Sequence, residues 1–514
     1  MKKLSCLFLA FLFLLSCTAC TDWDELSNDP LQELSQYYQS ENDSQTAPEI
    51  YSFTLPYYDS ETLDGVTCRD GFQQVLGKLL YECLYEPDPA FDPQPVLAES
   101  SRYDAETLTY TIRLRSNIRF SDSSPLTAQD VADTLLRAAE SARYGSRFDQ
   151  VDTITAADQE VIITLLTPNG GFLSLLDIPI VKSGTESQKI PLGTGPYAVA
   201  KEDNKNYLAP NQYWWQNKRL PLSRIELLPC KSSDAANYAF TAQNIQLICS
   251  DLIGTDPISV DFSGDCTDAP DTALHYLGFN LRNELLVNSN VRRAIGCAID
   301  RGSLVATYLL GHAVQTQFPL SPASDAYPRE LEQPYSRDTL DSAMEKAGLH
   351  RGGEKTELTL VVNEENRFKV AAASEIARVL NQYDLAVTVQ ALPWEDYYNA
   401  LVYGQYDLYY GETKLRADWD FSALIASDGR LNFGGFFDPA TDTLLQCYLA
   451  AQGQARLSAL HDLCLDFQEK QPIVPICFKS VSVLVTKGAV EHITPTAGNP
   501  FYQLENWTVN LSES

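Results

Sequence analysis

The sequence predicts an α/β fold, and three observations support this prediction. Apolar residues make up 44% and charged residues 21% of the 514 residues, as in ordinary globular proteins. Strand and helix patterns alternate between residues 358 and 410, as in parallel strands connected by helices. No internal repeat is visible, and no low-complexity block follows residue 48. We therefore expect a globular α/β body behind a separate N-terminal segment.

The first 16 residues have the pattern of a signal peptide. Lys2 and Lys3 form a short basic region, and residues 4–16 are almost entirely apolar. This run of 13 residues is too short to cross a bilayer as a helix, but it suits the apolar core of a secretory signal. Leu-Leu-Ser precedes Cys17, which resembles a bacterial lipobox. We expect residues 1–16 to be removed and Cys17 to be acylated, with Cys20 as the alternative, so that the protein is lipid-anchored on the extracytoplasmic face of the cell membrane.

Residues 17–48 are expected to form a lipidated acidic tether. From Thr21 to Pro48 the chain is polar, acidic and poor in aliphatic residues, so it cannot build a core. A coil of this length spans about 30 Å, enough to hold a domain away from a membrane. Cys17 and Cys20 form a C-x-x-C pair, but its place at the end of a signal disfavours a redox or zinc site.

Charge and residue counts exclude several functions. With 38 basic and 68 acidic side chains the net charge is −30, which repels phosphates and excludes nucleic-acid binding through a basic face. The five histidines are scattered, so we expect no metal site. Nine cysteines follow Cys20 at wide spacings. Because their number is odd and their spacing is wide, the sequence does not indicate which of them form disulfides. Most of these cysteines are expected to be buried apolar residues.

Two strands and a helix are predicted in the N-terminal half. Residues 108–114 alternate apolar and polar side chains, which indicates a half-buried strand, and residues 161–166 indicate another. Between them Thr127 is followed three residues later by Asp130, a spacing typical of a capping box at the start of a helix.

The C-terminal half is predicted to contain a parallel βαβαβ unit, followed by a helix pair and two strands. The expected strands are 358–362, 387–392, 406–410, 474–478 and 481–485. The expected helices are 368–380, 394–403, 441–451 and 456–469.

Enzyme motifs are mostly absent. Residues 193–198 match G-x-G-x-x-A, but a dinucleotide site needs a helix directly after the second glycine. Here Pro196 and an extended stretch follow, which predicts a sharp turn between strands. No P-loop, H-E-x-x-H, EF-hand or G-x-S-x-G pattern occurs. We therefore expect a protein that is not an enzyme, with no cofactor.

Four segments carry a resemblance to a known family. They are Tyr81-Glu-Cys-Leu-Tyr85 continuing through residue 131, Gly193-Thr-Gly-Pro-Tyr197 with Asn211-Gln-Tyr-Trp-Trp215, residues 277–313, and Asp341 to Gly348. In this order, and behind a lipobox, they resemble the extracellular solute-binding proteins of family 5. These are oligopeptide- and dipeptide-binding components of ATP-driven importers, with a nickel-binding branch. The resemblance covers roughly residues 50–510.

The resemblance implies a two-lobed, clam-like fold with mixed sheets and helices on both faces. Lobe I is expected to comprise residues 49–276 and 484–514, with an extra subdomain at about 70–190. Lobe II would comprise residues 277–483. The chain should cross between the lobes near 276–280 and 476–483.

The resemblance also implies a function. The protein would be a monomeric substrate-binding lipoprotein that captures oligopeptides or dipeptides and delivers them to ABC permease subunits. Alternatives are the same fold binding a metal chelate or another small solute, or a cell-surface sensor or hydrolase.

The family's site residues map onto one segment of this sequence. In peptide-binding members an Asp pairs with the ligand's α-ammonium group, and the matching residue is Asp418. Trp419 beside it is expected to supply apolar wall, and Arg416 to lie at the same site. Asp420 is expected to cap a helix over residues 421–426. Glu412 stands where some members carry an Arg for the peptide carboxylate; Lys414 and Arg416 are possible substitutes.

Overall fold

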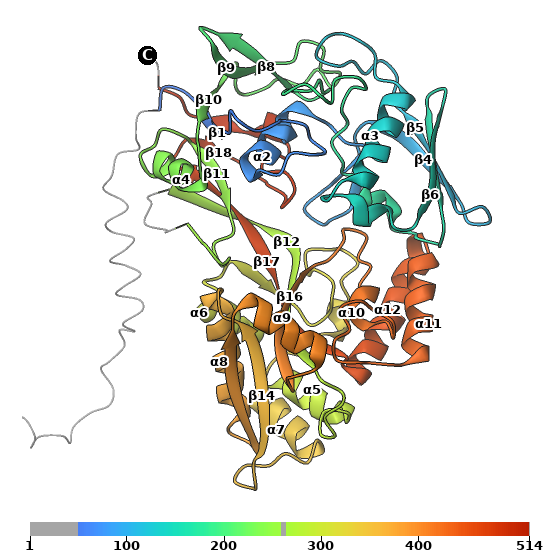
Figure 1. The fold of residues 1–514 in the computed structure, drawn as a ribbon, viewed down its shortest axis with the longest axis vertical. Coiled ribbons are helices and arrows are strands. Elements are labelled where there is room, and N and C mark those ends of the chain that lie inside the picture. Colours follow the sequence, from blue (N-terminus) through green and yellow to red (C-terminus); the bar gives the residue numbers. More distant parts are fainter. Residues whose placement is uncertain (1–49, 259–263, 513–514) are drawn as a thin grey trace, which may run out of the picture. The chain divides into compact units, whose positions relative to one another are not determined.

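A computed structural model describes residues 50–258 and 264–512 of the protein (Figure 1). The chain divides into two units, Met1–Pro48 and Glu49–Ser514, and the fold described below is that of the second. The expected signal peptide (1–16), the acylation sites Cys17 and Cys20, and the tether (17–48) lie outside the described residues. Within the described ranges, no helix is both long and apolar enough to cross a membrane.

The first sheet has four strands in the order β1-β10-β9-β8, of which β1 and β10 are parallel and the other pairs antiparallel. Its elements, with the helix α2 that packs on it, are β1 (Thr54–Tyr57), α2 (Gly71–Leu80), β8 (Tyr197–Glu202), β9 (Lys205–Pro210) and β10 (Ile225–Pro229). Its core also includes residues near the C-terminus, among them Val485 and Trp507.

A second sheet is antiparallel throughout, in the order β4-β5-β7-β6. Its elements are β4 (Ala98–Asp104), β5 (Thr109–Leu114), α3 (Ala128–Glu140), β6 (Val151–Ala157) and β7 (Glu160–Leu165). Helix α3 packs on it (Figure 1). The predicted strands are confirmed, and so is the capping box. Asp130 N donates to Thr127 Oγ1 over 3.2 Å, and Thr127 N donates to Asp130 Oδ2 over 2.9 Å.

The third sheet has seven strands, ordered β11-β17-β12-β16-β14-β15, with β13 also paired to β17. The strands are β11 (Leu247–Ser250), β12 (Gly264–Phe279), β13 (Ala313–Gln315), β14 (Thr356–Asn363), β15 (Leu385–Leu392), β16 (Leu408–Lys414) and β17 (Ile473–Thr486). Strand β14 is parallel to both β15 and β16, which confirms the predicted βαβαβ unit. The remaining pairs are antiparallel, so the sheet is mixed.

Helices cover both faces of this sheet. They are α5 (Ser289–Cys297), α6 (Arg301–Tyr308), α7 (Arg337–Lys346), α8 (Arg367–Leu380), α9 (Trp394–Tyr403), α10 (Ser422–Ile425), α11 (Pro439–Ala450) and α12 (Gly453–Lys470). Leu360 and Val362 of β14 belong to the core with α5 to α8, whereas Val361 belongs to the core with α9 to α12. Successive side chains point to opposite faces of a strand, so a strand buried on both faces is apolar throughout.

The two longest strands, β12 and β17, pair antiparallel and run side by side (Figure 1). Val483 and Val485 of β17 pack in the core of the first sheet, and Val474 and Ile476 pack with α5 to α8. Both segments expected to be extended at the lobe crossings lie in these strands, apart from Asn280. Residues 474–478 and 481–485 were expected as two strands. They form one, because Lys479 and Ser480 continue the ladder.

The remaining elements are short. They are β2 (Tyr85–Pro87), β3 (Pro93–Pro95), α4 (Ser233–Thr241), β18 (Val490–Glu491), β19 (Thr508–Val509) and the 3₁₀ turns Gly145–Phe148, Phe172–Leu175, Arg329–Leu331 and Leu504–Asn506.

The Gly193-Thr-Gly195 segment forms the predicted turn and leads into β8. A Cβ atom on Gly193 would lie 2.2 Å from the carbonyl oxygen of Leu80, and one on Gly195 would lie 2.5 Å from the carbonyl carbon of Leu80. Gly195 N also donates to Leu80 O over 2.9 Å. The two glycines therefore allow the turn to lie directly against the end of α2.

Candidate ligand-binding site

A tight turn after β16 carries the three residues that the sequence predicts at the ligand site. Trp419 N donates to Arg416 O over 3.0 Å, and Trp419 adopts a φ of 55°. This left-handed conformation costs a bulky residue about 1–3 kcal/mol, so the surrounding packing must stabilise it. The turn directs the side chains of Asp418 and Trp419 inward, and these residues are only 2% and 7% exposed.

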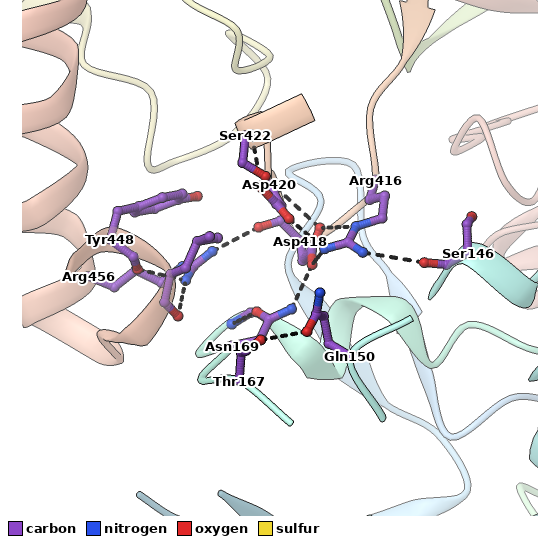
Figure 2. Close-up of polar contacts among 12 residues, drawn as sticks. Ser146, Gln150, Thr167, Asn169, Arg416, Asp418, Asp420, Ser422, Tyr448 and Arg456 are labelled. Carbon is purple, nitrogen blue, oxygen red and sulfur yellow. Dashed lines mark hydrogen bonds and ion pairs between the residues drawn. The ribbon is translucent and has the colours of Figure 1, made fainter. Parts of the chain in front are cut away.

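The Asp418 carboxylate lies at the centre of the polar contacts drawn in Figure 2. Its Oδ2 accepts hydrogen bonds from Asn169 Nδ2 at 2.8 Å and from Arg416 Nη2 at 3.0 Å. Its Oδ1 accepts longer ones from Arg416 Nε and Asp420 N, both at 3.3 Å. Arg456 Nη2 donates to the backbone oxygen of Asp418 at 2.8 Å. Both carboxylate oxygens therefore have donors.

Asn169 reaches Asp418 from the second sheet, because it follows β7. The Asn169 side chain is buried. The backbone carbonyl oxygen of Asn169 accepts a hydrogen bond from Tyr110 Oη of β5 at 2.8 Å. The neighbouring Gly170 N donates to Leu449 O at 2.7 Å, and Gln452 Nε2 donates to Tyr110 Oη at 3.1 Å. The second sheet thus meets the α11–α12 connection and the turn after β16, and Asp418 lies at that junction.

Trp419 packs between aromatic rings that are far apart in the sequence. Its ring centroid lies 5.1 Å from that of Phe91 and 5.7 Å from that of Phe478, both edge to face. Such pairs contribute about 0.5–1.5 kcal/mol beyond the area they bury. Trp419 is therefore a residue of the aromatic core next to Asp418 in the chain.

Arg416 and Asp420 complete the turn. Arg416 Nη2 lies 2.7 Å from Asp420 Oδ2, so this guanidinium bridges Asp418 and Asp420. Asp420 was expected to cap a helix over residues 421–426. Helix α10 begins at Ser422, whose N–H donates to Asp420 Oδ1 at 2.9 Å, so Asp420 does bind the helix start. One guanidinium between two carboxylates leaves a net charge of −1 on the turn.

Two cavities in the described part of the chain lie elsewhere. One of about 1030 Å³ is lined by α5, α6, α7 and neighbouring loops, and one of about 410 Å³ by residues including Glu82, Trp214 and Tyr502. Arg416, Asp418 and Trp419 line neither. In this conformation Asp418 is covered by protein groups, and the Asn169 amide occupies the place beside its carboxylate.

Glu412 belongs to a second polar cluster, on the sheet itself. It forms ion pairs with Lys369 of α8 and Lys479 of β17, the latter at 3.2 Å, and His275 Nε2 lies 3.4 Å from its carboxylate. Lys479 also pairs with Asp251 after β11. The charges of Glu412, Asp251, Lys369 and Lys479 sum to zero.

Burial and charge have opposite effects on this cluster. Burial alone would raise the pKa of Glu412, but its contact with His275 and the charges of Lys369 and Lys479 outweigh burial and hold that pKa far below its usual value. Burial lowers the pKa of His275, so its imidazole is neutral at pH 7. Tyr410 Oη, 3.1 Å from His275 Nδ1, fixes the ring.

The family resemblance singled out Glu412, where some members carry an Arg, but it did not indicate Lys369 or Lys479. Lys479 could have been noticed, because it is the only charged residue of the mostly apolar strand β17. Lys369 gives no such signal, since a charged residue near the start of a helix is ordinary. Lys414, one suggested substitute, is exposed and pairs with Asp271 at 3.0 Å. Arg416, the other, is held by Asp418 and Asp420.

Comparison with known proteins identifies the class. The model of the bacterial extracellular solute-binding proteins, family 5 (middle region), matches residues 92–430. The chain therefore belongs to this family. Solved structures with the same fold match it as well.

Several relatives are similar over much of their length. The oligopeptide-binding protein AppA of Bacillus subtilis is 25% identical over 383 residues, 68% of this chain and 67% of AppA. The glutathione-binding protein GsiB of Escherichia coli K12 is 25% identical over 316 residues, 57% of this chain and 60% of GsiB. The chain thus matches about three fifths of GsiB.

Solved structures extend the likeness to nearly the whole fold. The murein tripeptide-binding protein MppA, in an unliganded open form, superposes with a TM-score of 0.74 at 19% identity, covering 90% of this chain and 99% of MppA. A nickel ABC transporter protein from Bacillus halodurans gives 0.74 at 20% identity, with 88% and 98% covered. These likenesses establish the two-lobed fold that the sequence predicted.

Proposed function

We propose that this protein is the substrate-binding lipoprotein of an ABC importer, which captures peptides outside the cell and delivers them to a membrane permease. The family membership supports solute binding, and the names of AppA, GsiB and MppA support a peptide ligand. The protein would bind its ligand without turnover, as a monomer anchored through Cys17 or Cys20.

The Asp418 carboxylate is the observation that carries the peptide assignment. It is buried where separate parts of the fold meet, and Asn169 donates to it across that junction. A ligand ammonium group would replace the Asn169 amide, because both present N–H donors to the same oxygen. In a desolvated site the charged donor makes the stronger hydrogen bond, so a free amino group is favoured.

Binding would then be coupled to closure. When the junction opens, Asp418 loses the Asn169 contact and keeps Arg416. When it closes on a ligand, the ammonium group and the apolar wall of Trp419 fill the space between. The surface formed on closure is what a permease can recognise.

The two residues suggested for the peptide carboxylate, Lys414 and Arg416, are both engaged by carboxylates of the described chain. The cluster around Glu412 balances its own charges. We therefore assign only the amino end of the ligand, to Asp418.

The alternative ligand is a metal chelate, favoured by the likeness to the nickel transporter protein of Bacillus halodurans. Mass spectrometry of solutes that co-purify with the protein distinguishes the two. Recovery of unmodified peptides supports the proposal, and recovery of a metal complex supports the alternative. A peptide returned cleaved after incubation would instead indicate a hydrolase.

A further inference from the structure

Another group of polar side chains lies apart from the ligand site and from the Glu412 cluster. Cys266, Asp268 and His312 each offer one potential metal-ligand atom, and these atoms all lie within 4.8 Å of one another. Cys266 Sγ is 3.8 Å from Asp268 Oδ1, and His312 Nδ1 is 2.9 Å from Asp268 Oδ2. No metal site was expected, because the five histidines are scattered in the sequence. His312 is 44 residues from Asp268, and the fold brings the two together.

The third sheet builds this cluster from two strands and the start of a third. Cys266 and Asp268 are two residues apart on β12, so their side chains share one face of the strand. Asp268 pairs with Ser482 of the neighbouring strand β17. His312 directly precedes β13, which pairs with β17 near Lys479, and its backbone carbonyl accepts from Ser480 N at 3.1 Å. The backbone therefore fixes all three residues.

The ligand set suits zinc. Thiolate, imidazole and carboxylate are the three protein donors that Zn²⁺ uses, and a thiolate with a carboxylate neutralises its two positive charges. Ligand atoms of a tetrahedral zinc site lie about 3.3–3.7 Å apart. The distance from Cys266 Sγ to Asp268 Oδ1 is close to this range, and one ligand atom from each of the three residues lies within 4.8 Å of the others. The imidazole–carboxylate hydrogen bond would lengthen by about half an ångström as zinc replaces its proton.

A supporting contact is already in place. Ser482 Oγ donates to Asp268 Oδ1 at 2.5 Å, which orients the carboxylate and leaves Oδ2 directed at His312. Hydrogen bonds of this kind fix metal ligands and typically change metal affinity 10- to 100-fold. Cys266 and Asp268 are exposed, so an ion can enter from solvent and keep water as a fourth ligand.

We propose that Cys266, Asp268 and His312 bind one zinc ion, which fastens β12 to the start of β13 across β17. The site is independent of the proposed peptide ligand, since it shares no residue with the turn around Asp418. The net charge of −30 on the chain raises the local concentration of cations around it.

The test uses the full-length protein, kept reduced and freed of metal. Zinc affinity is measured by competition with a chromophoric chelator, and Co²⁺ is added as a spectroscopic probe because a cobalt–thiolate bond gives a charge-transfer band. We expect one zinc ion per chain and a cobalt–thiolate band. Cys266→Ser should abolish the band. His312→Ala and Asp268→Asn should each weaken zinc binding at least 10-fold, and Ser482→Ala roughly 10-fold.

Cys447→Ser is the matched control, because Cys447 is also exposed but lies on α11. It should leave the band and the zinc affinity unchanged. Circular dichroism verifies that each variant is folded, and since all three ligands are at or near the surface we expect no change. The proposal is overturned if the unaltered protein shows no cobalt–thiolate band, or if the band and the zinc affinity survive both Cys266→Ser and His312→Ala.

Discussion

Asp418 holds a negative charge that is removed from water but not left alone. Arg416 pairs with it from within the same turn, and Asn169 donates from a different sheet. If the junction opens as proposed, Asp418 would lose Asn169 and keep Arg416, because only Arg416 belongs to the same turn.

Asp418→Asn should keep the shape of the site and remove its charge. Losing a charge-assisted hydrogen bond in a desolvated site costs about 1.5–3 kcal/mol, so peptide affinity should fall roughly 10- to 150-fold. Titration calorimetry with free and N-acetylated peptide measures the coupling. N-acetylation of the peptide should lower its affinity for the unaltered protein by a similar factor and its affinity for the variant by much less.

Asp428→Asn is the control for this substitution, because Asp428 is exposed a few residues beyond α10. It should bind both peptides as the unaltered protein does. Equal binding of free and acetylated peptide by the unaltered protein would show that Asp418 is only a structural residue of the turn.

Because of Glu412, the free energy of unfolding should decrease as the pH falls into the acid range. Its folded pKa is depressed, so its contribution to the free energy of unfolding is fully present above the unfolded value of about 4.3 and is lost as the pH falls through the folded pKa. Glu412→Gln should lower stability at pH 7 by about 1 kcal/mol, because Lys369 and Lys479 lose a partner that is partly open to solvent. Below pH ~4 the difference between variant and unaltered protein should shrink.

Urea unfolding at several pH values measures this dependence. Glu354→Gln, at an exposed loop position, should follow the unaltered protein throughout. A Glu412→Gln deficit that stays constant from pH 7 to pH 3 would mean that the deficit does not arise from the charge of Glu412.

The sequence predicted which residues belong to the candidate site better than it predicted which residues contact them. Asp418, Trp419 and Arg416 could be named from a motif, since each lies within one short segment. Asn169 could not, because it lies 249 residues from Asp418 and has no motif of its own. Lys369 and Lys479 acquire their role only when α8 and β17 meet Glu412.

At the scale of elements, close backbone contact holds the junction together. Gly170 lies against the α11–α12 connection, and a Cβ atom at this position would come 1.9 Å from Ala451 O. Backbone cannot move aside as a flexible side chain can, so only glycine fits this contact.

Gly170→Ala should therefore oppose closure without disturbing either core. Overpacking of this kind costs typically 1–3 kcal/mol, so ligand affinity should fall roughly 5- to 150-fold. Small-angle scattering should show that the variant stays expanded in the presence of ligand that compacts the unaltered protein. Gly498→Ala, at a position with no neighbour within 4 Å of the added carbon, is the control and should behave normally. Full compaction of the Gly170 variant would refute the role given to this contact.

Elements with regular periodicity were predicted well, whereas the continuity of β17 was not. The alternation in residues 109–114 and the capping box at Thr127 are local signals, and the structure confirms them. The continuity of β17 through Lys479 and Ser480 is not local, because it depends on β12 and β13 completing the hydrogen bonds of two polar residues.

At the scale of the whole molecule, β12 and β17 are the structural link between two packed regions. One end of this pair lies in the core of the first sheet and the other among α5 to α8. Their pairing shifts register between Pro270 and Leu274, where the ladder is interrupted. Interrupted strands bend more readily than regular ones, so rotation between the two regions would be expected to concentrate there.

The location of the protein depends on the segment before residue 49. A short apolar run that ends in Leu-Leu-Ser before Cys17 predicts cleavage and diacylation there. Two acyl chains anchor a protein stably, whereas one gives only marginal, reversible binding. Cys17→Ser combined with Cys20→Ser should therefore release the protein from the membrane fraction or leave its signal unprocessed.

Fractionation of cells followed by mass measurement of the N-terminus distinguishes these results. Cys17→Ser alone should suffice if Cys17 is the acylated residue, and Cys20→Ser alone should then have no effect. Cys447→Ser, which removes an exposed thiol far from the signal, should remain bound to the membrane as the unaltered protein does. Membrane retention of a double variant whose signal has been removed as in the unaltered protein would show that acylation at these cysteines does not anchor the protein.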